Sequence, residues 1–196
     1  NQGFYDQALE QYFAALAAYE DAGNKQGIAS CYNDIAIIHY FQESYDLCIE
    51  YLTKSLEIKQ QLGDKAGMAN CYNNIASVRS DQGFFEQAID NIMKAIELFR
   101  ETDDKNGIAI GYGNIGTINY NSGHYQAALE NHLKSLEMHR EADNKDGIAH
   151  SLGNIASTYG TMADSVARTD SERIHFLNEA VSYGNQAFQL AEELDA

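Results

Sequence analysis

One stretch of the chain matches a phosphate-binding pattern. Gly111, Gly113 and Gly116 are spaced as in G-x-G-x-x-G, the glycine-rich turn that holds the pyrophosphate of a dinucleotide. That chemistry needs a strand before the turn and a helix N-terminus that points at the phosphate. Here the glycines fall in the middle of a segment that we expect to be helical, where backbone N–H groups already have partners. We therefore reject a nucleotide site at this position.

The histidines and cysteines show no spacing typical of catalysis or metal binding. The sequence has no HExxH motif, no histidine pair four residues apart and no CxxC. Cys31, Cys48 and Cys71 are predicted to be buried thiols. No Ser/His/Asp or paired-carboxylate arrangement stands out either. We expect no enzymatic activity, no catalytic residue, no metal ion and no cofactor.

The strongest feature of the sequence is an internal repeat of 40 residues. A phrase of the form Asn/Asp-Lys-x-Gly-Ile/Met-Ala recurs four times, and its lysines are Lys25, Lys65, Lys105 and Lys145. A second phrase with the same period begins at Gly3, Gly83 and Gly123, and its remaining copy has Glu43 in place of the glycine. Copies in constant register indicate a repeat protein in which each unit packs on its neighbours.

Each unit predicts two helices. In the unit 64–103, Asp64 is an N-cap residue, and the helix that follows has apolar residues on one stripe up to about Gln82. Gly83 interrupts the chain, and residues 85–99 then carry apolar side chains at three- and four-residue steps. The chain contains no proline. We expect an all-α fold with nine long helices, paired antiparallel, and no strand.

The charge restricts the partners. The chain has 29 acidic and 13 basic residues, a formal net charge of −16, and no Lys/Arg cluster. Such a surface repels phosphates and anionic lipid, so we expect no nucleic acid to bind through this segment. No apolar run approaches the ~18 residues of a membrane span, so we expect no membrane insertion. The unpatterned cysteines favour a reducing, cytoplasmic location, and a periplasmic sensor segment is the alternative.

These residues resemble the tetratricopeptide repeat. The shared features are a Tyr-x-x-Ile-Ala stripe on the first helix of each unit, a Gly-x-Tyr/Phe turn, and Ala-Leu/Ile-Glu on the second helix. The unit is longer than the common 34-residue form and is similar to the repeats of Pins scaffolds, kinesin light chains and bacterial signalling proteins. The resemblance implies an α-solenoid, a right-handed superhelix whose concave face, lined by first helices, holds peptides or partner proteins.

Placing the sequence on the family pattern indicates a ligand groove on the first helices. Polar and small residues occupy the groove positions: Asn33, Asn73, Asn74, Ser77, Gly113, Asn114, Thr117, Asn121, Gly153, Asn154 and Ser157. Asparagine both donates and accepts, so these side chains suit the backbone of an extended peptide. Alternatively, the column formed by Asp34, Asn74, Asn114 and Asn154 ties one hairpin to the next. Because Gly113 and Gly153 lack side chains, we expect the groove to be roomiest in the last two units.

The family also contains a basic clamp for C-terminal carboxylates, which this sequence lacks. Phe41, Asp81, Asn121 and Thr161 stand at the matching places.

The repeat boundaries predict a single array. Residues 1–23 are a half repeat, 24–63, 64–103 and 104–143 are full repeats, and 144–196 is a last repeat. A ~12-residue insertion interrupts the last repeat near 163–175; it is a candidate functional loop or a helix extension. The uncovered helices at the two ends predict weak end-to-end self-association.

The sequence therefore predicts a scaffold that binds a protein or a peptide. We expect it to be the sensing or docking segment of a larger, bacterial signalling or regulatory protein. The alternative is a structural module whose partner is another copy of itself.

Overall fold

A computed structural model describes residues 2–195, so residues 1 and 196, the outermost of the predicted array, lie outside the described residues. The described chain is all-α and contains no strand. Its helices are α1 (Gln2–Asp21), α2 (Lys25–Phe41), α3 (Tyr45–Leu62), α4 (Lys65–Asp81), α5 (Phe85–Glu101), α6 (Lys105–Asn121), α7 (Tyr125–Glu141), α8 (Lys145–Ser165) and α9 (Asp170–Asp195). The nine predicted helices are confirmed over this range.

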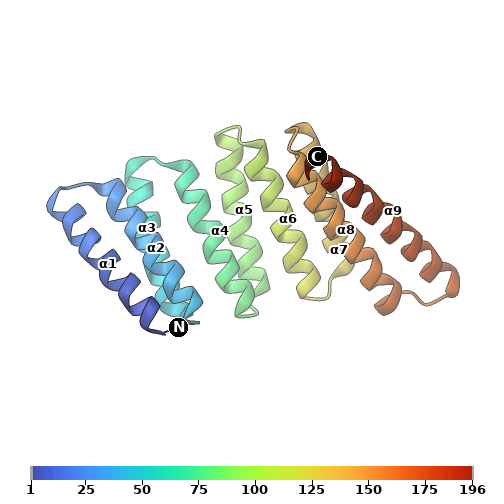
Figure 1. Cartoon of the computed structure of the whole chain (residues 1–196), viewed down its shortest axis with the longest axis horizontal. Helices are drawn as coiled ribbons and strands as arrows, with labels where there is room; N and C mark the ends of the chain where they lie inside the picture. The colour runs from blue at the N-terminus through green and yellow to red at the C-terminus, as the bar shows by residue number, and fades with distance from the viewer. Residues whose placement is uncertain (1, 196) are drawn as a thin grey trace. The chain divides into compact units, whose positions relative to one another are not determined.

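The chain divides into two compact units, residues 1–98 and residues 99–196. In the first, α1 packs on α2, α2 on α3, and α3 on α4. In the second, α6 packs on α7, α7 on α8, and α8 on α9. Within each unit, consecutive helices run antiparallel because a short turn joins them (Figure 1).

A left-handed residue ends each of the first seven helices. Residues with positive φ occur every 20 positions, at Gly23, Glu43, Gly63, Gly83, Asp103, Gly123 and Asp143. Each follows a helix and closes it with reverse hydrogen bonds; for example, the amide of Ser44 donates to the carbonyl of His39 at 2.9 Å. Glycine adopts this conformation without strain, whereas Glu43, at φ 57°, carries a side chain there. The backbone therefore repeats every 20 residues, one helix and one turn, which is half of the 40-residue sequence repeat.

The Asn/Asp-Lys-x-Gly phrase begins the first helix of every repeat. Asp64 accepts a hydrogen bond from the Gly67 amide at 2.9 Å, as an N-cap residue does, and Asn24, Asp104 and Asn144 cap their helices in the same way. The glycine leaves space for the preceding helix. A Cβ added at Gly107 would lie 2.5 Å from the Phe99 ring, far inside van der Waals contact. The repeated glycine therefore allows the preceding helix to pack closely against the start of the first helix.

The second unit replaces an aliphatic core residue with histidine. His132 in α7 stands where the earlier repeats have Leu52 and Ile92, and its side chain is only 2% exposed. On α6 it faces Gly116, where the other repeats have alanine; an added Cβ would lie 2.5 Å from His132 Nδ1. The larger ring and the smaller backbone residue thus compensate each other within one repeat.

The predicted insertion at 163–175 is largely helical. The helix α8 continues to Ser165, four residues beyond the point where the other first helices end, and α9 begins at Asp170. In the first turn of α9, Glu172 accepts hydrogen bonds from the amides of Arg168 and Thr169 in the connection. These bonds lower the pKa of the Glu172 carboxyl group.

Candidate functional site

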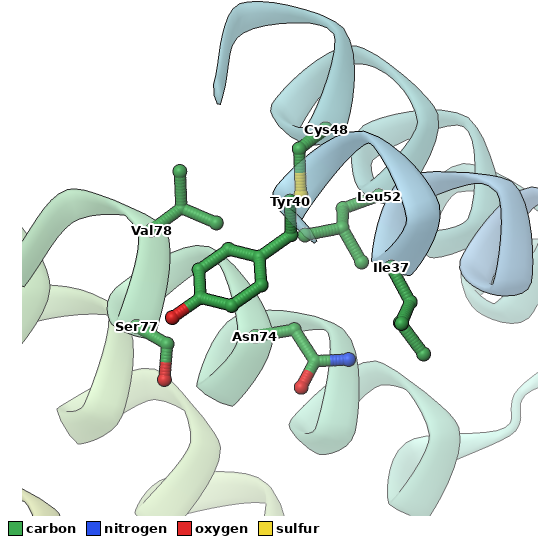
Figure 2. A pocket seen from close by; sticks show the side chains of 7 residues that line it. All are labelled: Ile37, Tyr40, Cys48, Leu52, Asn74, Ser77 and Val78. Atoms are coloured by element: carbon green, nitrogen blue, oxygen red, sulfur yellow. The ribbon is translucent and has the colours of Figure 1, made fainter. Parts of the chain in front are cut away.

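The first unit contains a pocket of about 170 Å³ between its first helices. The residues that line it come from three helices: Ile37 and Tyr40 from α2, Cys48 and Leu52 from α3, and Asn74, Ser77 and Val78 from α4. In Figure 2 the Tyr40 ring lies among the other side chains, with Val78 and Ser77 to its left, Asn74 below it, and Leu52 and Ile37 to its right. The pocket therefore depends on two consecutive repeats.

The floor of the pocket is apolar and rigidly packed. Cys48, Leu52 and Val78 are each no more than 2% exposed and belong to one core cluster with Ala36 and Ile75. Cys48 stands where the following repeats have alanine, and burial raises the pKa of its thiol to about 11. A thiol that stays protonated behaves as a small apolar group, so the floor offers no charge to a ligand.

The rim of the pocket is polar on the α4 side. Asn74 Nδ2 donates to Asn33 Oδ1 on α2 at 3.1 Å, which ties neighbouring repeats together. A hydrogen bond with Asn33 lowers the pKa of the Asp34 carboxyl group, but burial outweighs it, so that this pKa is raised overall. A chain of polar groups therefore runs from Asp34 through Asn33 to the pocket at Asn74.

The opposite edge is fixed by a tyrosine–carboxylate bond. The Tyr40 hydroxyl donates to Asp81 Oδ2 at 2.6 Å, a distance typical of a charge-assisted bond. This bond, followed by burial, raises the pKa of the Tyr40 hydroxyl to about 12. The bond joins α2 to α4, so it holds both the ring and the carboxylate in place. In the second unit, Tyr120 and Thr161 form the equivalent contact at 2.8 Å.

The structure brings two of the predicted groove residues, Asn74 and Ser77, into the pocket, and Asn33 contacts it through Asn74. Ser77 is exposed. Asn73 is placed differently: its Oδ1 atom is enclosed by protein and has no hydrogen-bond partner among the described residues. The Asn33–Asn74 bond is the hairpin tie that the sequence left open as an alternative role, and Asn74 lines the pocket as well.

The remaining predicted residues lie on α6 and α8 in the second unit. Thr117 and Ser157 are exposed at positions equivalent to Ser77, and Asn121 is exposed at the end of α6. An added Cβ at Gly113 would contact Ser135 Oγ at 3.2 Å, whereas one at Gly153 would meet nothing within 4 Å. Asn114 and Asn154 are partly buried, and no side-chain hydrogen bond of Asn154 is found among the described residues.

Sequence reasoning missed Tyr40, Leu52 and Val78 as pocket residues. Their apolar spacing is the same as that of ordinary core residues, so the pattern alone does not separate a pocket wall from a core. A signal was present in the pairing of Tyr40 with Asp81 and of Tyr120 with Thr161. The two residues of each pair are 41 positions apart in the sequence, and the second pair follows the first by 80 positions, which is two repeats.

No group of three or more His, Cys, Asp or Glu side chains in residues 2–195 could hold a metal ion. None of the described helices is long and apolar enough to cross a membrane.

The family model of the tetratricopeptide repeat matches residues 1–61, 32–101 and 67–141. These matches cover well over half of the chain, and the chain belongs to the tetratricopeptide repeat family. The predicted family and the all-α class of repeated antiparallel hairpins are confirmed. As a class, these repeats are non-catalytic protein-interaction modules. No curated protein matches the chain at a significant level.

Solved structures share the fold at low sequence identity. The crystal structure of BtubC from P. vanneervenii is 17% identical, with a TM-score of 0.79 over 100% of this chain and 76% of that one. The apo form of RapI is 16% identical, with a TM-score of 0.79 over 98% of this chain and 50% of that one. A Rap protein complexed with competence and sporulation factor is 18% identical, with a TM-score of 0.73 over 97% and 51%. The chain thus spans about half the length of the Rap proteins.

Proposed function

We propose that this chain is a scaffold that binds a peptide, or an extended segment of a partner protein, on the first helices of its repeats. The observation that carries the proposal is the pocket of Ile37, Tyr40, Asn74 and Ser77, which has a buried apolar floor and hydrogen-bonding groups at its rim. This combination is typical of sites that fix one side chain and orient the backbone beside it.

The rim has hydrogen-bonding capacity to offer. Asn74 uses one amide hydrogen on Asn33, so its carbonyl oxygen and second hydrogen can reach a backbone amide and carbonyl of a ligand. The exposed Ser77 hydroxyl adds a donor and an acceptor one helical turn away. An extended peptide presents alternating N–H and C=O groups, which match such a row of amide and hydroxyl groups.

In the second unit, Asn154, Thr117 and Ser157 supply similar groups, and we propose that they contact the same kind of ligand. We further propose that the chain is the docking or sensing segment of a larger signalling protein. Support comes from the Rap proteins, which share this fold over about half of their length, one of them complexed with competence and sporulation factor.

The test is selection of peptides from a displayed library of random 12-residue sequences, followed by anisotropy measurements with the labelled peptides. Ser77→Arg places a long side chain at the mouth of the pocket. Thr53→Arg makes the same charge change at an exposed position of α3 that does not line the pocket. We expect Ser77→Arg to weaken binding at least about tenfold, because it removes the anchor contact, and Thr53→Arg to change it less than twofold. Equal effects of the two variants, or no selected peptide, would reject the function.

Self-assembly is the second candidate, favoured by apolar side chains exposed at each end of the chain. Phe4 and Phe13 on α1 are 73% and 43% exposed, and Val181 and Phe188 on α9 are 61% and 64% exposed. Such surface favours association, while the net charge of −16 opposes it. End-to-end association should therefore strengthen with salt in light scattering across a concentration series. A monomer at high concentration and high salt contradicts it.

A further inference from the structure

We propose that the pocket binds a basic–apolar segment: an extended peptide with one aliphatic side chain in the pocket and a lysine or arginine within about three residues of it. The inference rests on the proposed function and specifies the chemistry of its ligand. It follows from a second, shallow hollow beside the pocket, which is separated from the pocket by Tyr40.

The apolar half of the ligand follows from the size and lining of the pocket. A cavity of roughly 150 Å³ with aliphatic walls accepts a benzene molecule, and the pocket here measures about 170 Å³. Its floor of Leu52, Val78 and Cys48 is buried and belongs to one hydrophobic core cluster. A leucine, isoleucine or valine side chain fits this space, whereas a charged side chain loses hydration there without gaining a partner.

The basic half follows from the second hollow. It is lined by Glu43, Ser44, Tyr45, Asp46, Leu47 and Gln82 and has a volume of about 250 Å³. Tyr45 lies against Tyr40, with ring centroids 6.2 Å apart, so the two hollows share one aromatic wall. Asp81, which accepts the Tyr40 hydrogen bond, is adjacent in sequence to Gln82. Glu43 and Asp46 therefore bring two carboxylates to the second hollow, and Asp81 adds a third beside the Tyr40 ring.

Negative charge exceeds positive charge at the site. Among the described residues that line the two hollows there is no lysine or arginine. Arg79 on α4 is the nearby positive charge: it donates at 3.0 Å to Gln82, which lines the second hollow, and lies over the Phe84 ring. The field at the site is thus negative, and the chain as a whole carries a net charge of −16. An acidic or phosphorylated segment would be repelled, whereas a basic segment is attracted.

The spacing of the two halves fits an extended chain. Each residue of a strand advances about 3.3 Å, and alternate side chains point to opposite faces. A basic residue two positions from the aliphatic anchor therefore points to the same side and lies about 7 Å along the chain. The second hollow adjoins the pocket across the Tyr40–Tyr45 pair, whose ring centroids lie 6.2 Å apart, which agrees with a separation of one to three residues.

The experiment uses the peptides selected on the whole chain. We expect the selected sequences to share an aliphatic residue with a lysine or arginine within three positions. For one such peptide, anisotropy is measured for the parent and for two changed versions, aliphatic→Ala and basic→Gln. Glu43→Gln with Asp46→Asn neutralises the second hollow. Glu57→Gln with Glu97→Gln is the matched control, because it makes the same charge change at exposed positions that line neither hollow.

We expect the Glu43/Asp46 double variant to weaken binding of the parent peptide by about three- to tenfold at low salt, and the control variant by less than about twofold. The basic→Gln peptide should bind both variants equally. The aliphatic→Ala peptide should bind the unchanged protein at least about tenfold more weakly than the parent.

Three outcomes overturn the proposal. Selected peptides that are acidic, or that lack the aliphatic–basic pair, leave the proposed function standing and remove this ligand class. Equal effects of the two double variants remove the role of the second hollow. Dimerisation of the protein that Ser77→Arg abolishes, seen in sedimentation, assigns the pocket to a second copy of the chain. Failure to select any peptide instead rejects the proposed function itself.

Discussion

His132 makes the second unit sensitive to acid, and this can be measured. The side chain is buried in α7 against Gly116, and its Nδ1 atom has no hydrogen-bond partner among the described residues. Burial, with a smaller contribution from the charge of His150, lowers the pKa of His132 from 6.5 to about 4. The folded state therefore holds the imidazole neutral at a pH where the unfolded chain already binds a proton.

The sign and size of the effect follow from this difference. Above about pH 6.5 the ring is neutral in both states, and stability is unaffected. Between about pH 6.5 and pH 4 the unfolded state binds the proton preferentially, so the free energy of unfolding falls as the pH falls. A pKa depressed by about 2.5 units corresponds to about 3 kcal/mol, and the loss is complete below about pH 4.

The assay compares unchanged protein with His132→Ile, which introduces the residue found at the equivalent position 92. Urea unfolding of both proteins is followed by circular dichroism at several pH values between 7.5 and 4. Carboxyl groups and the other histidines titrate in both proteins, so their contributions cancel in the difference. We expect the difference in unfolding free energy to shift by about 3 kcal/mol in favour of the variant as the pH falls across this window.

Replacement of the exposed His124 by Gln controls for the loss of a histidine as such. If the two unfolding curves of unchanged protein and His132→Ile keep a constant separation from pH 7.5 to pH 4, the reasoning is wrong. His132 would then be protonated in the folded state, and its burial would cost nothing in acid.

The other predictions concern the repeat architecture. Gly116→Ala should destabilise the protein by about 1–3 kcal/mol, because the new methyl group overlaps the His132 ring, and by less in the His132→Ile background; a thermodynamic cycle from urea unfolding measures the coupling, and additive effects contradict it. Glu43→Gly should raise stability by about 1 kcal/mol and Gly83→Ala lower it by a similar amount, because both residues have positive φ; opposite shifts in melting temperature are the expected result. Asp64→Ala should cost about 1 kcal/mol and Asp64→Asn much less, since only the first removes the acceptor for the Gly67 amide; equal losses of stability would contradict the capping role.

The fold was predictable because the same helix-starting phrase recurs at a constant spacing. A single Asn/Asp-Lys-x-Gly phrase is ambiguous, but four copies with constant spacing define where helices begin, and Gly83 and Gly123 mark where others end. The resemblance to the tetratricopeptide repeat indicated which helix of each repeat would carry the candidate ligand residues. Asn74 and Ser77 on those helices line the pocket, and their contact with a ligand stays a prediction.

The pocket itself was not predictable from the repeat. It depends on the offset between neighbouring hairpins, which brings residue 33 to residue 74 and residue 40 to residue 81, separations of 41 rather than 40. A period gives the spacing of equivalent residues, whereas these contacts join non-equivalent ones. The sequence shows that Gly116 replaces the alanine of the other repeats, but it does not show the cause, which is the His132 ring from the next helix.

The left-handed residue at every twentieth position has a consequence for how such a chain can change length. An unequal crossover that removes or duplicates 40 residues within the regular repeats, from α1 to α7, leaves every helix, cap and turn in phase. The packing of His132 against Gly116 is an exception. A 40-residue deletion that ends between these two residues places His132 against Ala76, whose methyl group occupies the space that Gly116 leaves open. A deletion that ends before Gly116 keeps the pair intact. The backbone of the regular repeats therefore permits recombination, and the side chains decide which recombinants fold well.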